Sequence, residues 1–164
     1  MTPDNRTPVS VKVAGGAALI AALVMATTLI SNFEGIRTHA YRDQVGVPTI
    51  CMGHTEGVEM GQTSTRTACM DLLQTDVRKY ASGVLPCIHV PTVPIASLAA
   101  YISFSYNVGT KAFCSSAVVR RLNAGDLAGS CAAMDQWVYA GGKRNQGLVN
   151  RRRAERAYCE RGLG

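Results

Sequence analysis

Residues 34–49 read Glu34-Gly35-Ile36-Arg37-Thr38-His39-Ala40-Tyr41-Arg42-Asp43-Gln44-Val45-Gly46-Val47-Pro48-Thr49. Eight residues separate Glu34 from Asp43, and five more separate Asp43 from Thr49. The spacing can place Glu34 at a helix end and Asp43 on the following strand, and Gly46 and Pro48 suit a tight turn that returns Thr49 toward Asp43. Glycosidic bond cleavage uses two such acids, one to protonate the leaving oxygen and one to act on the sugar cation or the attacking water. Spacing alone is weak evidence, because two acids nine positions apart are common in proteins.

Other motifs accompany this stretch in a fixed order along the chain. They are Phe33-Glu34-Gly35, Tyr41-Arg42-Asp43, Gly46-Val47-Pro48-Thr49-Ile50-Cys51-Met52-Gly53-His54-Thr55, Ser105-Tyr106-Asn107-Val108-Gly109, Trp137-Val138-Tyr139-Ala140-Gly141-Gly142-Lys143 and Gly147-Leu148-Val149-Asn150-Arg151-Arg152. Together they resemble phage lysozymes of glycoside hydrolase family 24, over roughly residues 33–161. The resemblance implies an α+β, lysozyme-like fold, mainly helical with a small antiparallel β-region. It also implies a muramidase without a cofactor, which hydrolyses the β-1,4 bond between N-acetylmuramic acid and N-acetylglucosamine in peptidoglycan for host lysis.

The same resemblance implies that Glu34, Asp43 and Thr49 are catalytic. To donate a proton at neutral pH, Glu34 must itself be protonated, which an apolar wall such as Phe33 and a central helix would favour. Asp43 should stay ionised and, with the Thr49 hydroxyl, stabilise the sugar cation or activate water. The alternatives are an ion pair between Glu34 and Arg37 and a purely structural turn aspartate at Asp43. Whether the product is inverted or retained depends on the carboxylate separation, which the sequence does not give.

Further candidates for substrate contact follow the catalytic stretch. His54 fits a hydrogen-bonding residue that supports the β-region better than it fits a catalytic base. The candidates for the sugar groove are His54, Tyr106, Asn107, Tyr139, Gly141 and Lys143. Helix packing is the simpler alternative for the tyrosines.

Residues 13–33 contain no charged side chain. A helix of about 21 residues would be about 31 Å long, close to the roughly 30 Å hydrocarbon core of a bilayer. Six alanines and Gly15-Gly16 make its insertion only weakly favourable. Three interpretations compete: a signal peptide cleaved after Ala26, a permanent anchor, and a signal-arrest-release segment that later leaves the bilayer uncleaved. The composition resembles the last of these, a subgroup of phage endolysins, so we expect a membrane segment at 1–33 and a catalytic domain at 34–164.

The cysteines indicate the compartment in which the domain works. Six of them are spread along the chain without a Cys-x-x-Cys motif or zinc-ligand spacing, so we expect disulfides and no metal site. Six cysteines allow 15 pairings; we expect the three that join neighbouring elements, Cys51–Cys69, Cys87–Cys114 and Cys131–Cys159. The domain should therefore face the periplasm, first tethered to the host inner membrane through residues 13–33 and then soluble. While the segment is in the bilayer, Glu34 would be held away from Asp43, and release would let the segment pack on the domain.

The net charge of +6 is concentrated near the end of the chain. The basic residues there are Lys143, Arg144, Arg151, Arg152, Arg153, Arg156 and Arg161. Aromatic residues are not interleaved with them as nucleic-acid stacking would require, so we expect no nucleic acid partner. An anionic cell wall is an equally suitable partner for this cluster of positive charge. The simplest interpretation of the cluster is a solvated helix face. We expect a monomer.

Turn residues and periodicity predict the remaining elements. We expect a β-region over 40–62, then a helix capped by Thr63 or Thr65 that runs to about Ala81 and is stopped by Gly83 and Pro86. A rigid connector over 84–94 and a buried helix over 95–108 should follow. We then expect a helix from the cap Ser115 to Asn123, a helix from the cap Asp126 through Val138, and a last helix from about Asn145 to Glu160 with its arginines on one side.

Three other functions compete with hydrolysis. A lytic transglycosylase uses a glutamate without needing Asp43 or Thr49 and leaves a 1,6-anhydro sugar. A tethered wall-binding protein would need none of the three residues. A cationic membrane-disrupting protein would act through the basic last helix and lose activity in salt.

Overall fold

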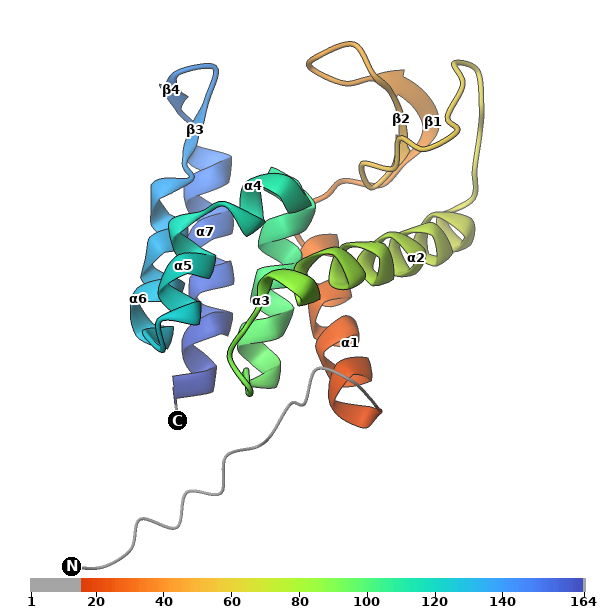
Figure 1. The fold of residues 1–164 in the computed structure, drawn as a ribbon. Helices are drawn as coiled ribbons and strands as arrows, with labels where there is room; N and C mark the ends of the chain where they lie inside the picture. Colours follow the sequence, from red (N-terminus) through yellow and green to blue (C-terminus); the bar gives the residue numbers. More distant parts are fainter. Residues whose placement is uncertain (1–15, 164) are drawn as a thin grey trace, which may run out of the picture.

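The computed structural model describes residues 16–163, which form a helical body with two small antiparallel sheets (Figure 1). The elements are α1 (Ala17–Ser31), β1 (Arg37–Arg42), β2 (Pro48–Cys51), α2 (Arg66–Val84), η1 (Leu85–Cys87), α3 (Ile95–Val108), α4 (Thr110–Cys114), α5 (Ala117–Asn123), α6 (Leu127–Ala133), η2 (Met134–Gln136), β3 (Tyr139–Ala140), β4 (Lys143–Arg144), α7 (Gln146–Glu160) and η3 (Arg161–Leu163). The expected mainly helical α+β architecture is confirmed.

Helix α3 is the centre of the core. Residues 97–105 of this helix are all buried, because α1, α2 and α7 pack around it. Tyr101, Phe104 and Phe113 of α4 form the aromatic part of this core, with ring centroids about 6 Å apart. The helix begins and ends where the sequence predicts, after Pro94 and before Gly109, whose φ of 89° ends the helix.

Helix α1 packs along α3 rather than extending away from the domain (Figure 1). The small side chains of Ala22 and Ala26 are fully buried in this contact, whereas Ile20 and Val24 on the other face are each 61% exposed. Within residues 16–163, no helix combines the length and apolar character needed to span a bilayer. Positions 1–15 of the membrane segment expected over 1–33 lie outside the described residues.

Strands β1 and β2 form a separate lobe beside the helices, and β1 begins three residues earlier than expected (Figure 1). They pair antiparallel, Arg37 opposite Cys51 and Tyr41 opposite Thr49, with an irregularity in β1 between those pairs. The Cys51–Cys69 disulfide ties β2 to the first turns of α2. Asp43 and Thr49 are therefore on a lobe covalently fixed to the helical body.

The helices between α3 and α7 depart from the sequence-based expectation. Helix α4 was not expected, and Ser116 rather than Ser115 caps α5, with its hydroxyl accepting from the Val119 N–H. Helix α6 begins at the expected cap, Asp126, but ends at Ala133, so that Trp137 and Val138 follow a 3-10 turn.

Gly83 does not stop α2, which continues to Val84. A Cβ at Gly83 would lie 2.8 Å from the Thr110 side chain, so this glycine permits close contact with α4. The cap Thr65 is confirmed, because its side chain accepts from the Ala68 N–H. The last helix begins where expected, and there the Asn145 side chain accepts from the Leu148 N–H.

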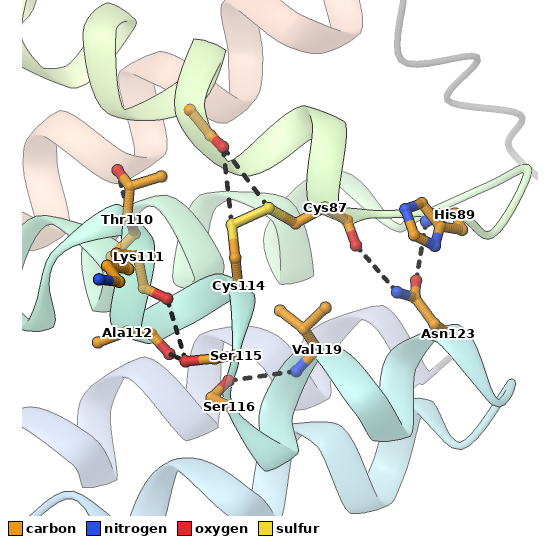
Figure 2. The surroundings of a disulfide bond; sticks show 12 residues. Cys87, His89, Thr110, Lys111, Ala112, Cys114, Ser115, Ser116, Val119 and Asn123 are labelled. Atoms are coloured by element: carbon orange, nitrogen blue, oxygen red, sulfur yellow. Dashed lines mark hydrogen bonds between the residues drawn. A yellow bond between two sulfur atoms is a disulfide. The ribbon is translucent and has the colours of Figure 1, made fainter.

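Three disulfides connect the elements, and they are the pairs expected from the sequence: Cys51–Cys69, Cys87–Cys114 and Cys131–Cys159. The first and third are buried, whereas Cys87 and Cys114 are only half-buried. Figure 2 shows the Cys87–Cys114 bridge, which joins η1 to α4. Nearby, the Asn123 amide donates to the Cys87 carbonyl oxygen (2.9 Å) and accepts from the His89 N–H (2.8 Å), which fixes the connector after α2.

Candidate active site

Glu34 lies directly after α1, where its backbone N–H donates to the Ile30 carbonyl oxygen at 3.0 Å. Its side chain, 27% exposed, forms an ion pair with Arg151 of α7, with Nη1 2.6 Å from Oε1. The Arg151 guanidinium also lies 5.4 Å from the centre of the Phe33 ring. Among the described residues, Arg37 forms no ion pair with Glu34, so that alternative is not what the structure contains.

Arg151 belongs to a buried group of charges at the interface of α7 and α3. Glu155 is fully buried and accepts from Arg151 Nε (3.0 Å), from Ser103 Oγ (2.7 Å) and from Arg152. Arg152 also bonds to Asn107 and donates from Nε to the Trp137 carbonyl oxygen at 3.0 Å. Every donor and acceptor in such a group needs a partner, because a buried unpaired charge costs several kcal/mol.

This group corrects the expectation that the arginines of the last helix share one face. Arg151 and Arg152 are 4% and 1% exposed and point into the protein, whereas Arg153 is exposed. Burial lowers the pKa of Arg152 because desolvation disfavours its charged form, although nearby Glu155 opposes that effect.

Asp43 lies in the turn between β1 and β2. Its Oδ1 accepts from the N–H groups of Val45 (3.0 Å) and Val47 (2.8 Å), and its own N–H donates to the Val47 carbonyl oxygen. These bonds hold the carboxylate in one orientation. Thr49 is 2% exposed, and its hydroxyl donates to the Val47 carbonyl oxygen at 2.9 Å. Asp43 therefore stabilises its turn and also lines the groove that contains Glu34.

Two adjoining hollows meet at Glu34. One, of about 720 Å³, is lined by Glu34, Asp43, Thr49, Tyr106 and Asn107, among others. The other, of about 740 Å³, runs toward Trp137 and Tyr139 and the start of α7. Because both are lined by Glu34, Gln44 and Asn107, they form one groove that extends to either side of Glu34. A polymer chain can lie in such an open groove.

Three of the six expected contact residues line this groove, namely Tyr106, Asn107 and Tyr139. The Tyr106 hydroxyl donates to the Met52 carbonyl oxygen at 2.7 Å, and burial raises the pKa of this tyrosine. Gly141 and Lys143 belong to the β3–β4 hairpin and do not line either hollow.

His54 lies outside the groove and supports the β-lobe. Its Nδ1 lies 2.8 Å from an Asp76 carboxylate oxygen on α2, and its Nε2 lies 3.0 Å from the Glu56 carbonyl oxygen. This is the supporting position that the sequence favoured over a catalytic one.

The sequence reasoning missed Arg151 as the partner of Glu34. The four-residue spacing from Arg151 to Glu155 was visible as a helical ion pair. Their burial against α3 was not visible, because it depends on how α7 is rotated. Within residues 16–163, no three His, Cys, Asp or Glu side chains are grouped to hold a metal ion.

Comparisons with known proteins agree on one family. A model of the phage lysozyme family matches residues 31–155. The SAR-endolysin of Enterobacteria phage P21 is 38% identical over 161 residues, which cover 97% of each chain. The SAR-endolysin of Bacteriophage PS119 is 39% identical, over 97% of this chain and 96% of that one.

Solved structures are similar over most of the chain. The muramidase domain of SpmX from Asticaccaulis excentricus has a TM-score of 0.76 and 30% identity, over 82% of this chain and 93% of that one. A mutant of P22 lysozyme has a TM-score of 0.72 and 33% identity, over 85% and 95% of the two chains.

Proposed function

The chain belongs to the phage lysozyme family, and from this premise we propose that Glu34, Asp43 and Thr49 form its catalytic group. Membership makes the chain a phage endolysin and a muramidase hydrolase. Its substrate bond is the β-1,4 linkage between N-acetylmuramic acid and N-acetylglucosamine in peptidoglycan. The observation that supports the residue assignment is that all three side chains line one groove.

In this proposal Glu34 donates a proton to the leaving glycosidic oxygen. Proton transfer leaves a carboxylate, whose charge the Arg151 guanidinium 2.6 Å away stabilises. The adjoining Phe33 and the bound polysaccharide exclude water from one side of Glu34, which strengthens its interactions with Arg151 and with the substrate. Glu155 keeps Arg151 in place through the bond to Nε.

Asp43 acts on the sugar from the β-lobe. Two backbone N–H groups hold its Oδ1, so its negative charge is fixed in direction before substrate binds. That charge stabilises the positive charge that develops on the sugar ring. The Thr49 hydroxyl, two residues after Val47, helps to orient the attacking water beside Asp43.

Substitution of the two acids tests this assignment. We expect Glu34→Gln and Asp43→Asn to lower the rate of peptidoglycan digestion by about 10²–10⁴-fold, since general acid catalysis is worth that much. Glu59→Gln, in an exposed loop of the same lobe, is the control and should keep full activity. Circular dichroism checks that each variant is folded. Wall digestion by Glu34→Gln at the wild-type rate would contradict the proposal and favour a wall-binding or membrane-disrupting protein.

We also propose that the chain is exported by signal arrest and release and acts as a monomer. Residues 13–33 would tether it to the host inner membrane, facing the periplasm, until the segment leaves the bilayer and packs as α1. Two relatives carry the name SAR-endolysin. Cleavage after Ala26 would remove Ala22 and Ala26 from the core, which supports an uncleaved segment.

The mass and N-terminal sequence of the soluble periplasmic protein test this route. An intact Met1 or Thr2 is expected. A protein that begins at Thr27 would contradict release and identify a cleaved signal peptide.

A further inference from the structure

Arg37 and Tyr41 form a pair on the β-lobe side of the groove. The Arg37 guanidinium carbon lies 4.2 Å from the centre of the Tyr41 ring, which is a cation–π contact. Both residues line the hollow that holds Glu34 and Asp43. None of the roles assigned above to the catalytic residues uses this pair.

The shape of β1 explains how the two side chains meet. Residues four apart lie on the same face of a strand, but at about 3.3 Å per residue their Cα atoms would be about 13 Å apart. In β1 the register shifts between Arg37 and Tyr41, so that five residues of β1 face only three of β2. Such a bulge bends the strand and redirects side chains, here placing the guanidinium over the ring.

Arg42 and Arg151 near the groove form hydrogen bonds or ion pairs with protein groups, whereas the Arg37 side chain forms neither with any residue in the described range 16–163. Arg42 Nη1 donates to the Gly46 carbonyl oxygen at 2.9 Å, and Arg151 is paired with Glu34 and Glu155. Within residues 16–163, Arg37 has neither an ion pair nor a side-chain hydrogen bond, although it is exposed in a groove with two carboxylates. Its donors are thus available to a ligand, and stacking on Tyr41 reduces the number of positions that the guanidinium can take.

We propose that Arg37, held over Tyr41, binds a carboxylate carried by the muramic acid units of the substrate. The inference rests on the proposed function, because it concerns the polymer that occupies that groove. A guanidinium binds a carboxylate through two parallel N–H bonds. Peptidoglycan offers two sources of that group: the carboxylates of the stem peptide, and the lactyl carboxylate of muramic acid units that have lost their peptide. N-acetylglucosamine carries neither, so Arg37 would distinguish one sugar of the strand from the other.

The test compares Arg37→Gln with wild type on three forms of one purified peptidoglycan. The first is untreated. The second has its carboxylates converted to carboxamides with carbodiimide and ammonia. The third has been stripped of stem peptides by an amidase, which exposes the lactyl carboxylates. Arg120→Gln, an exposed arginine of α5, is the matched control and should leave kcat/KM unchanged on all three.

We expect Arg37→Gln to lower kcat/KM about tenfold on the polymer that carries the bound carboxylate, which is the low end of the contribution of a hydrogen bond to a charged group. On amidated wall the ratio of wild type to variant should fall to about one. A tenfold ratio on untreated wall identifies the stem peptide, because the lactyl carboxyl there is in amide linkage to that peptide. A tenfold ratio confined to stripped strands identifies the lactyl carboxylate. Arg37→Lys, which keeps the charge but not the paired donors, should restore part of the rate.

An equal loss on untreated and amidated wall, or no loss on both untreated wall and stripped strands, would overturn the proposal. A thermal melt separates the first result from misfolding, because a variant damaged in folding also melts at a lower temperature. Failure of the proposed function itself looks different. In that case the wild type would digest none of the three polymers, or Glu34→Gln would digest all of them.

Discussion

Replacement of Glu155 by glutamine tests whether the buried ion pairs hold Arg151 in contact with Glu34. Glu155 is fully buried, and its two oxygens accept from Arg151, Arg152 and Ser103. Glutamine has nearly the same size but no charge, and its NH₂ group would face a guanidinium. Removing one partner of a buried ion pair costs about 3–5 kcal/mol. We take the lower end, about 3 kcal/mol, because the glutamine carbonyl can still accept one bond.

The expected signal is a lower melting temperature with the disulfides intact. For a domain of this size each kcal/mol shifts the Tm by about 2–4 °C, so Glu155→Gln should lower it by about 6–12 °C. Below the transition, the variant should also digest peptidoglycan more slowly than wild type, since Arg151 would no longer be held against Glu34.

Glu160→Gln is the matched control on the same helix. Glu160 also pairs with an arginine four residues away, Arg156, but that pair is about 40% exposed. Exposed pairs contribute about 0–1 kcal/mol, so the Tm should change by no more than about 4 °C. Equal shifts for the two variants, or a Glu155→Gln protein as stable as wild type, would refute the importance of burial here.

Three further predictions concern the β-lobe, a disulfide and a buried tyrosine. Thr49→Val removes the hydroxyl and should lower the rate of wall digestion at least tenfold, whereas Thr49→Ser keeps the hydroxyl and should retain most of the rate. Equal rates for the two variants would contradict a role for that hydroxyl. Mild reductant should open the half-buried Cys87–Cys114 bridge before the two buried bridges, as alkylation and mass mapping would show. Because this bridge closes a loop with a sequence separation of 27, its loss should lower the free energy of unfolding, measured by denaturant titration, by about 3–4 kcal/mol. Burial raises the pKa of Tyr101 to about 12. As the pH rises, this tyrosine therefore ionises in the unfolded chain before it does so in the folded protein, and the free energy of unfolding should fall between about pH 10 and pH 12. Tyr101→Phe should make this fall with pH less steep, and an unchanged steepness would contradict the prediction.

The sequence predicted elements whose limits depend on local signals. The uncharged run between Pro94 and Gly109 is long enough to be recognised as a buried helix, and the cap residues Thr65, Asp126 and Asn145 mark helix starts through their own side chains. Helix α4 escaped prediction because five residues are too few to display helical periodicity. Gly83 was misleading as a stop, because its role in contacting Thr110 is tertiary.

The residues of the candidate site also differ in whether local sequence signals could predict them. The spacing of Glu34, Asp43 and Thr49 is local, and the resemblance to a family pointed to all three residues. The partner of Glu34 is Arg151, which is 117 residues away in the sequence, so no local pattern could identify it. Arg37 was the nearer candidate by helical spacing, but α1 ends at Ser31 and β1 begins at Arg37, so helical spacing does not relate Glu34 to Arg37.

Digestion of peptidoglycan in water enriched in heavy oxygen tests the central claim most directly. The products would be reduced at once with borohydride and analysed by mass spectrometry. Hydrolysis by the Glu34 and Asp43 pair predicts one heavy oxygen on the newly formed reducing end of muramic acid, and no such product from Glu34→Gln. Unlabelled 1,6-anhydromuramic acid as the main product would contradict it and identify a lytic transglycosylase.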